Sequence, residues 1–227
     1  MAWRYLVGDE GPDDDGRIRA LVPGLPYTAS VGLFKPKLTD EQKKRLPPGQ
    51  YLTEKWPVLH YGSVPKVDMS TWDFRVWGEV EEPLTFDWTE FRTMPRTSLH
   101  TDIHCVTRWS RLDADFEGVH ISTILGRAKP SPAARFVIAH AEQGYTANMP
   151  LEVLDDDDVI LADIADGVPL TPEHGYPLRL VVPKRYFWKS AKWIRGLEFR
   201  SSDQLGFWER YGYHNDADPW KEERFSD

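Results

Sequence analysis

From residue 72 onward, short apolar runs alternate with polar turns, which is the pattern of short β-strands. Residues 74–78 (FRVWG) alternate between apolar and polar positions and stop ahead of Pro83, so they predict a strand followed by a turn. Similar runs predict strands at 98–106, 135–140, 144–149, 159–164, 178–182 and 192–199. The turn DGVP (166–169) directly after one of them predicts a hairpin.

Helical patterns are few and short. Residues 85–94 begin with threonine and aspartate and stop before Pro95, which predicts a short helix. A second short helix is predicted over 122–128 (STILGRA), with Ser122 as its cap. Short strands with few helices favour an α+β fold, with a mixed β-sheet core and short helices.

Turn and breaker residues are dense near the start of the chain. They predict an irregular N-terminal arm over 1–55 that wraps a single domain over 56–227. Within the arm, Thr39 or Asp40 is predicted to cap a short helix that ends at Pro47 and Pro48.

The chain is acidic, with 28 Lys and Arg against 36 Asp and Glu and a formal charge of −8. This balance argues against general nucleic-acid binding and against an anionic membrane surface. No run approaches the roughly 20 apolar residues of a transmembrane helix, and the first residues lack the pattern of an export signal. We therefore expect a cytoplasmic protein with no membrane span and no nucleic-acid partner.

The chain contains one cysteine, Cys105. A single cysteine excludes an internal disulfide, a CxxC redox pair, a zinc site built from cysteines and a protein-ligated iron–sulfur cluster. The Gly-rich dinucleotide fingerprint, the P-loop, HExxH and GxSxG are also missing from the sequence. The remaining chemical question is whether Cys105 is inert or reactive.

Three interpretations of the segment around Cys105 are open. In the first, the thiol is buried filling, as free cysteines often are. In the second, His100, Asp102 and His104 form a mononuclear iron or zinc site, because alternate strand positions share a face, although about 13 Å would separate the outer two. In the third, Cys105 is a thiolate metal ligand at a strand end, and Arg108 favours the thiolate.

A basic stretch stands out downstream against the acidic balance. It is interleaved with proline, aromatic residues and an apolar strand, and its cations are Arg179, Lys184, Arg185, Lys189 and Lys192. One interpretation is a solvated basic face, which is common for a run of charge. The other is a pocket for an anion such as a phosphate, which arginine binds bidentately and lysine as a point charge.

Several segments together resemble the molybdopterin-dependent domain of the sulfite oxidase family, and specifically its small stand-alone bacterial members. The matching pieces keep the family order across residues 56–213. They are FRVWG (74–78), DIHCVTRWS (102–110), FEGV (116–119), GYTANMPL (144–151), DGVPL (166–170) and the stretch 174–193. The resemblance implies a sulfite oxidase-type molybdopterin-binding fold and makes the metal-ligand interpretation of Cys105 the leading one.

The resemblance also implies roles for individual residues. Cys105 is the expected ligand to molybdenum, and Tyr213 is the expected active-site tyrosine. The expected contacts to the pterin and its phosphate are His60, Tyr61, His140, His174, Arg179, Ser190, Ala191 and Lys192. The charge and position of Arg108 give a separate hypothesis, in which it holds an oxyanionic substrate.

The resemblance thus implies a molybdenum-dependent oxidoreductase that moves an oxygen atom to or from a small sulfur- or nitrogen-oxo substrate. The chain lacks the family's haem and dimerisation domains, so we expect a separate electron-transfer partner and a monomer. Two alternatives stay open. One is a non-catalytic member of the fold that binds cofactor or anion, and the other is the iron or zinc protein described above.

Overall fold

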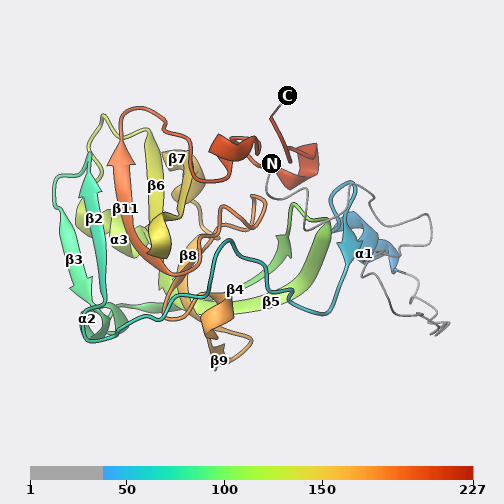
Figure 1. Ribbon diagram of the computed structural model, residues 1–227, viewed down its shortest axis with the longest axis horizontal. Coiled ribbons are helices and arrows are strands. Elements are labelled where there is room, and N and C mark those ends of the chain that lie inside the picture. Colours follow the sequence, from blue (N-terminus) through green and yellow to red (C-terminus); the bar gives the residue numbers. More distant parts are fainter. Residues whose placement is uncertain (1–37, 227) are drawn as a thin grey trace. The chain divides into compact units, whose positions relative to one another are not determined.

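Two mixed β-sheets form the described part of the chain (Figure 1), which is residues 38–226 of the computed structural model. The first sheet has the order β1-β5-β8-β10, with β4 paired to β5 and β9 to β8. Its strands are β1 (Tyr51–Leu52), β4 (Arg96–His104), β5 (Trp109–His120), β8 (Ile160–Ala165), β9 (Val168–Pro169) and β10 (Arg179–Val181). The pairing of β1 with β5 is parallel and the others are antiparallel.

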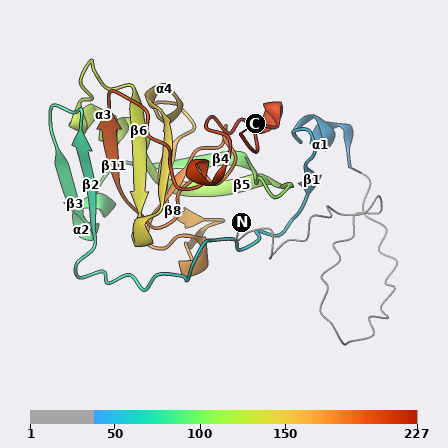
Figure 2. The same cartoon turned by 45° about the horizontal axis from the view of Figure 1, so that its top comes forward.

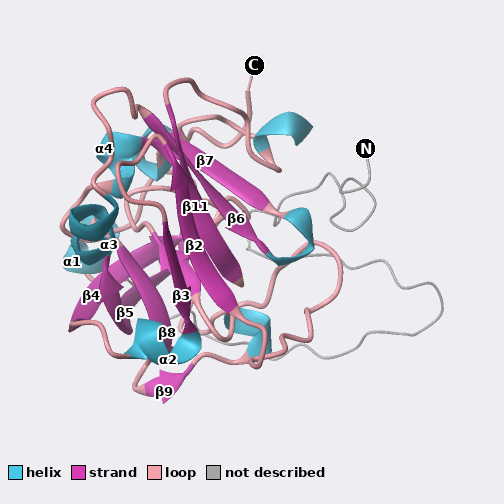
Figure 3. Ribbon diagram, turned by 90° about the vertical axis from the view of Figure 1, so that its left-hand side faces the viewer, coloured by secondary structure: helices cyan, strands magenta, loops and turns pink. Residues whose placement is uncertain are grey.

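The second sheet has the order β3-β2-β11-β6-β7, and Figure 3 shows its strands side by side. Its strands are β2 (Asp73–Gly78), β3 (Leu84–Asp87), β6 (Phe136–Ala141), β7 (Thr146–Pro150) and β11 (Ile194–Arg200). Only β11 and β2 pair in parallel. The predicted α+β class, with mixed sheets and short helices, is confirmed.

The helices in the described residues are short. They are α1 (Asp40–Lys44), α2 (Trp88–Arg92), α3 (Ile121–Ala128) and α4 (Leu151–Leu154), with 3₁₀ turns at Glu142–Gly144, Pro172–His174, Glu209–Tyr211 and Pro219–Lys221. Thr39 caps α1 in a capping box, as the sequence predicts. None of these helices is long and apolar enough to cross a membrane.

Two helix predictions were wrong in detail. A helix was predicted over 85–94, but residues 84–87 form a strand paired to β2. The helix is therefore limited to α2, and Asp87 is the N-cap of α2. The cap of α3 is His120, whose imidazole accepts the N–H of Ser122. Serine is the more common cap, but here the strand that ends at His120 already fixes an acceptor ahead of the helix.

Strand β5 was not predicted, although it pairs with β1, β4 and β8. Its acidic and basic side chains interrupt the apolar pattern, and a bulge between Glu117 and Gly118 shifts the register. The run DGVP does form the predicted hairpin, in which β9 pairs back on β8.

Apolar side chains cover both faces of the first sheet. In β8 and β10, Leu161 and Leu180 join the large core shared with the second sheet and α3. Ile160, Ala162 and Val181 face the other way, into a smaller core that includes Cys105. Alternation along the strands thus separates a core that holds the sheets together from one that surrounds the candidate site.

The described end of the predicted arm, residues 38–55, contacts the first sheet directly. Tyr51 pairs with Trp109, and Arg45 donates to both carboxylate oxygens of Asp102. Residues 1–37 of the predicted arm lie outside the described part of the chain.

Gly118 gives a stability test of the unpredicted strand. A Cβ at this position would lie 2.0 Å from the carbonyl oxygen of Leu161, so Gly118→Ala must force β5 and β8 apart. We expect a loss of about 3 kcal/mol in the free energy of unfolding, at the upper end for overpacking. Gly126→Ala is the matched control, because a Cβ there meets nothing within 4 Å and should stabilise α3 by about 0.5–1 kcal/mol. Equal stability of Gly118→Ala and Gly126→Ala in urea unfolding would contradict the register of β5 against β8.

Candidate functional site

Cys105 begins the loop that joins β4 to β5. Its N–H donates to the carbonyl of Trp109 over 2.8 Å, and its own carbonyl accepts from the N–H of Arg108 over 3.0 Å. Arg108 has a φ of 74° and accepts from the N–H of Tyr51, which ties the loop to β1. The hairpin extends toward α1 in both views (Figures 1 and 2), so the loop carries Cys105 to the end of the first sheet.

The sulfur of Cys105 lies in surroundings that act on its charge in opposite directions. Burial raises the pKa of the thiol, whereas the hydroxyl of Thr107, which donates to Sγ over 3.2 Å, lowers it. The charges of Arg224 and Lys192 lower it as well. Burial acts most strongly, so the pKa of the thiol lies above its usual value, and the donor and the two cations are the groups that would stabilise a thiolate once a metal ion is bound.

Arg179 provides a buried cation at the start of β10. Its Nη1 and Nη2 donate to the carbonyls of His174 and Ser190 over 2.9 and 3.1 Å. Its guanidinium lies 4.3 Å from the ring centre of Phe187 and 5.1 Å from that of Trp56. Burial lowers the pKa of Arg179 to about 9, and its Nε has no hydrogen-bond partner within residues 38–226. A buried cation with an unused donor fits an anionic group of a cofactor.

Lys192 lies beside Arg179. We call the predicted cofactor-binding group that contains these two cations, together with His174, Ser190 and Ala191, the cradle. The two residues form an isolated antiparallel bridge, and a Cβ at Gly175 would lie 3.1 and 3.2 Å from their Cβ atoms. The Lys192 ammonium donates to the carbonyls of Leu59 and Glu173. Burial, together with Arg179, lowers the pKa of Lys192 to about 7.

The other predicted members of the cradle are held in place by backbone contacts. The Ser190 hydroxyl accepts from the N–H of Val182 over 2.9 Å, and the carbonyl of Ala191 accepts from Leu180. His174 stacks on Trp56 with ring centres 4.1 Å apart. The structure thus brings five predicted contacts together, which are His174, Arg179, Ser190, Ala191 and Lys192.

His60 and Tyr61 come from a different segment. His60 lies edge-on to Trp193, with ring centres 5.8 Å apart, and thus next to Lys192. Tyr61 is 56% exposed and packs on Phe207 at 5.0 Å, so it contacts the C-terminal segment instead.

Tyr213 is buried near the cysteine. Burial raises the pKa of its phenol to about 12, and the charge of Cys105 acts in the same direction. Its ring packs against Trp188 at 5.1 Å and Trp208 at 5.0 Å. The predicted tyrosine therefore lies within electrostatic reach of the predicted metal ligand.

Two predicted residues lie apart from this group. His140 is on β6, where its Nε2 contacts a carboxylate oxygen of Glu198 over 2.9 Å and its ring packs on Trp77. The resemblance predicted a cofactor contact for His140, but in the second sheet its side chain contacts Glu198 and Trp77 instead. Arg108 is exposed, and its position at the loop tip leaves its side chain at the surface.

The proposed iron or zinc triad does not form. His100 contacts Asp115 over 2.7 Å, and Asp102 is engaged by Arg45. His104 is buried, with its Nδ1 2.8 Å from the hydroxyl of Ser110. In the described chain, no three His, Cys, Asp or Glu side chains are placed to hold a metal ion. This alternative is therefore wrong.

The cations of the basic stretch fall into two groups, one at the surface and one drawn inward. Lys184 and Arg185 form ion pairs at the surface, with Asp156 at 2.6 Å and Asp216 at 3.2 Å. Arg179 and Lys189 are buried instead, and Lys192 is partly buried. The surface interpretation fits Lys184 and Arg185, and the anion pocket stays a prediction for Arg179 and Lys192.

Sequence reasoning missed three features of the site. Trp56 stacks on His174, and Arg224 reaches the cysteine loop from the C-terminal end. Lys189 pairs with Glu209 over 2.6 Å, with both side chains 1% exposed. No motif marks these residues, although a lysine within an apolar run is a signal for a buried partner.

Lys192 gives a pH-dependent test of the cradle. Above pH 7 its amine is largely neutral, and a bound phosphate favours the charged form. Binding of sulfate, an oxyanion that does not titrate in this range, to cofactor-free protein should therefore take up nearly one proton at about pH 8 and almost none at about pH 6. Calorimetric titration in buffers of different ionisation enthalpy measures this uptake, and Lys192→Met should abolish it. Binding at pH 8 without proton uptake would contradict the assignment.

Known protein families and proteins resemble this chain over most of its length. A family model described as the oxidoreductase molybdopterin binding domain matches residues 61–208. YuiH, an uncharacterized oxidoreductase of Bacillus subtilis, is 46% identical over 187 residues, which are 82% of this chain and 94% of YuiH.

Two further proteins are more distant. MsrP, the catalytic subunit of a protein-methionine-sulfoxide reductase of Campylobacter jejuni, is 27% identical over 65% of this chain, which spans 57% of MsrP. The crystal structure of the sulfane dehydrogenase SoxCD from Paracoccus pantotrophus is similar with a TM-score of 0.60 and 21% identity, over 82% of this chain and 58% of that one. The latter shows a shared fold.

Proposed function

The chain belongs to the oxidoreductase molybdopterin-binding family, and on this premise we propose that it moves an oxygen atom to or from a small sulfur- or nitrogen-oxo substrate, with Cys105 as a ligand to molybdenum. Membership makes it a molybdenum-dependent oxidoreductase with a molybdopterin cofactor. The observation that carries the site assignment is the buried thiol of Cys105, to which Thr107 donates a hydrogen bond and whose pKa is lowered by the charges of Lys192 and Arg224.

The residues present fit this cofactor. Arg179 has an unused buried Nε, and Lys192 lies beside it, so the two cations would neutralise a pterin phosphate. Gly175 keeps this cradle narrow, because any Cβ there would meet both side chains. A soft thiolate from Cys105 suits a redox-active metal ion. When bound, the cofactor supplies the two-electron change of oxygen-atom transfer.

The protein's own residues would orient and shield the reacting groups. Thr107 donates a hydrogen bond to the sulfur of Cys105, which would orient the thiolate as a metal ligand. Tyr213, with its pKa raised to about 12, stays protonated at neutral pH and can donate a hydrogen bond to a substrate oxygen. Trp188 and Trp208 pack around it and restrict water.

We further propose a separate electron-transfer protein as partner, a cytoplasmic location and a monomeric state. The partner is proposed because the sequence carries no haem, flavin or nicotinamide motif. The location and the monomeric state are the expectations given in the sequence analysis.

Elemental analysis and turnover assays test this function together. Purified protein should contain about one equivalent of molybdenum, and it should turn over sulfite, nitrate, sulfoxides or N-oxides with artificial electron carriers. Iron or zinc without molybdenum would contradict the cofactor assignment. Full molybdenum loading with no turnover on any of these compounds would favour a non-catalytic cofactor-binding role.

A further inference from the structure

A buried ion pair joins the loop between β10 and β11 to the C-terminal segment. The ammonium of Lys189 and a carboxylate oxygen of Glu209 lie 2.6 Å apart, and both side chains are 1% exposed. The ammonium also donates to the backbone carbonyl and the side-chain oxygen of Asn148. An apolar pair of similar volume often stabilises a fold as well as a buried ion pair does, so stability alone does not explain these two charges.

Glu209 also holds the ring of Trp188. The indole N–H of Trp188 donates over 2.8 Å to Oε1 of Glu209, the same oxygen that pairs with Lys189. The carbonyl of Trp188 accepts from the hydroxyl of Tyr145 over 2.6 Å, so the residue is fixed at both its ring and its backbone. A hydrogen bond to an ionised carboxylate is about twice as strong as one between neutral groups, and apolar side chains offer no such acceptor.

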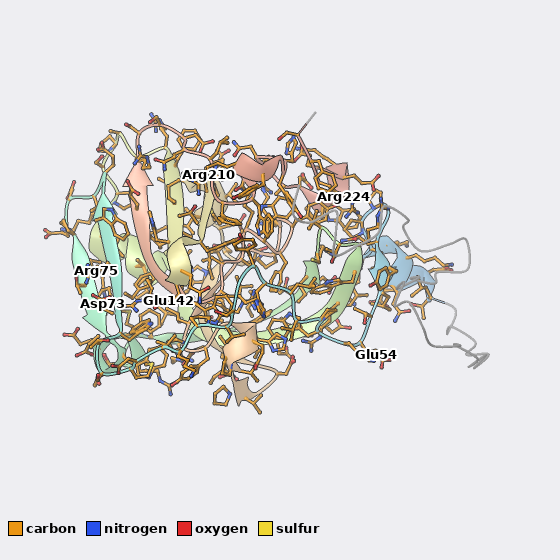
Figure 4. The ribbon with its side chains drawn as sticks, in the orientation of Figure 1. Glu54, Asp73, Arg75, Glu142, Arg210 and Arg224 are labelled. Carbon is orange, nitrogen blue, oxygen red and sulfur yellow. The ribbon has the colours of Figure 1, made fainter. Side chains whose placement is uncertain are left out.

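Trp208 is held by the same residue through the chain, because Glu209 directly follows it. The segment that carries both residues runs beside β7, where Figure 4 labels the next residue, Arg210. Its N–H at Phe207 donates to the carbonyl of Thr146 in β7 over 2.8 Å. The ion pair therefore limits the movement of two tryptophan rings that come from different segments.

These two rings enclose Tyr213. Trp188 lies edge-on to the phenol ring, with centres 5.1 Å apart and planes at 86°, and Trp208 lies tilted against it at 5.0 Å. Phe225 covers it from the C-terminal end at 5.2 Å. Three rings thus set the direction of the phenol, and Glu209 holds two of them.

The second oxygen of Glu209 shows that the carboxylate is not arranged for the greatest stability. This Oε2 atom is buried and has no hydrogen-bond partner within residues 38–226. A Cβ at Gly206 would lie 2.5 Å from it, so the chain leaves room for the oxygen without supplying a donor. A buried acceptor without a donor destabilises the folded state, which favours a role for the carboxylate in placing its neighbours.

We propose that Glu209 is a positioning residue for Tyr213. Its carboxylate, paired with Lys189, fixes the two tryptophan rings that direct the phenol. The assignment rests on the proposed function and deepens it, since Tyr213 is the proposed hydrogen-bond donor to a substrate oxygen. Such a donor stabilises a developing charge only when it is already aimed at that oxygen. Glu209 would not touch the substrate and would act through the rings alone.

Two double variants separate this role from stability. Lys189→Met with Glu209→Met, the apolar variant, removes the ion pair and leaves no acceptor for the indole of Trp188. Lys189→Met with Glu209→Gln, the amide variant, also removes both charges but keeps an oxygen that can accept the indole N–H. Because neither leaves a charge buried, the two should have similar melting temperatures. Arg210→Gln, at an exposed neighbour of Glu209, and Gly118→Ala, which loosens β5 against β8, are the controls.

The first readout needs neither cofactor nor turnover. Magnetic resonance of cofactor-free protein with ¹³C-labelled tyrosine rings gives signals from nine tyrosines, and Tyr213→Phe identifies that of Tyr213. The three packed aromatic rings should displace this signal from the position of an exposed tyrosine. It should move toward that position in the apolar variant and stay near the wild-type position in the amide variant and in both controls.

The second readout is turnover by the molybdenum-loaded enzyme, on whichever of sulfite, nitrate, a sulfoxide or an N-oxide the wild type converts. The apolar variant should lower kcat by about 10–100-fold, the effect of a misplaced group. KM should change by less than about twofold, because the hydrogen bond from the phenol matters most in the transition state. Adding Tyr213→Phe should lower kcat less in the apolar variant than in the wild type, since the phenol is already misdirected.

An unchanged Tyr213 signal in the apolar variant, or equal displacement in the apolar and amide variants, would overturn the proposal. Full additivity of Tyr213→Phe with the apolar variant would overturn it as well. If the loaded enzyme turns over nothing, the proposed function fails, and the tyrosine signal still decides whether Glu209 places the ring. If the apolar variant does not fold, Trp188→Phe removes the same hydrogen bond from its other end, and an unchanged kcat there would contradict the assignment.

Discussion

Replacing Cys105 with serine should abolish most oxygen-atom transfer. A serine hydroxyl is a harder and more weakly acidic ligand than a thiol, so the metal would lose the soft donor that suits its redox change. Changes to residues that only orient a metal ligand typically cost 10–100-fold in activity, so we expect the loss in Cys105→Ser to exceed about 100-fold. The measurement is kcat with artificial electron carriers, normalised to bound molybdenum.

Thr107→Val provides a graded comparison for that result. It removes the hydrogen bond to Sγ but keeps the sulfur, so its loss of activity should be smaller, within the 10–100-fold range for an orienting residue. Cys105→Ser with activity close to that of the wild type would mean that the thiol is buried filling. A larger loss in Thr107→Val than in Cys105→Ser would also contradict the assigned roles.

Lys189→Met should cost about 3–5 kcal/mol in the free energy of unfolding, because it leaves a buried carboxylate without its cation. Glu209, its partner at 2.6 Å, also accepts from the indole N–H of Trp188 over 2.8 Å. The Lys189 ammonium donates to the carbonyl and side-chain oxygens of Asn148 as well. The pair therefore fastens the C-terminal segment to the loop between β10 and β11 and, through Asn148, to β7.

Urea unfolding checks this expectation against a surface pair. Lys184→Met removes the 2.6 Å pair with Asp156, in which the lysine is 57% exposed, and should cost less than about 1 kcal/mol. The double variant Lys189→Met with Glu209→Met should recover part of the stability, since no charge is left buried. Equal losses in the free energy of unfolding for Lys189→Met and Lys184→Met would show that the buried pair is no more important to stability than the surface pair.

The strands with clear alternation were predictable from sequence. Residues 74–78 alternate at period two and residues 135–140 contain an unbroken apolar run, so both segments reveal their strands, β2 and β6, without any tertiary information. Strand β5 carried no such signal, because a close approach to Leu161 requires Gly118, and a glycine weakens the strand pattern. The helix limits failed for a similar reason, since β3 takes residues 84–87 by pairing with β2.

Most of the cofactor cradle was also predictable, because its motif residues lie close together in the chain. His174, Arg179 and Lys192 meet across one strand and one turn. Partners supplied from distant segments were not predictable. Asp102 is taken by Arg45, which is 57 residues away, and Arg224 reaches the Val106 carbonyl across 118 residues. Only the folded chain brings such pairs together.

X-ray absorption at the molybdenum edge counts the sulfur ligands of the metal and therefore shows whether Cys105 binds molybdenum. The spectra of the loaded wild type and of Cys105→Ser are compared, with Arg210→Gln as the control. We predict that Cys105→Ser loses one sulfur ligand, whereas Arg210→Gln keeps the wild-type spectrum. An unchanged number of sulfur ligands in Cys105→Ser would contradict the account.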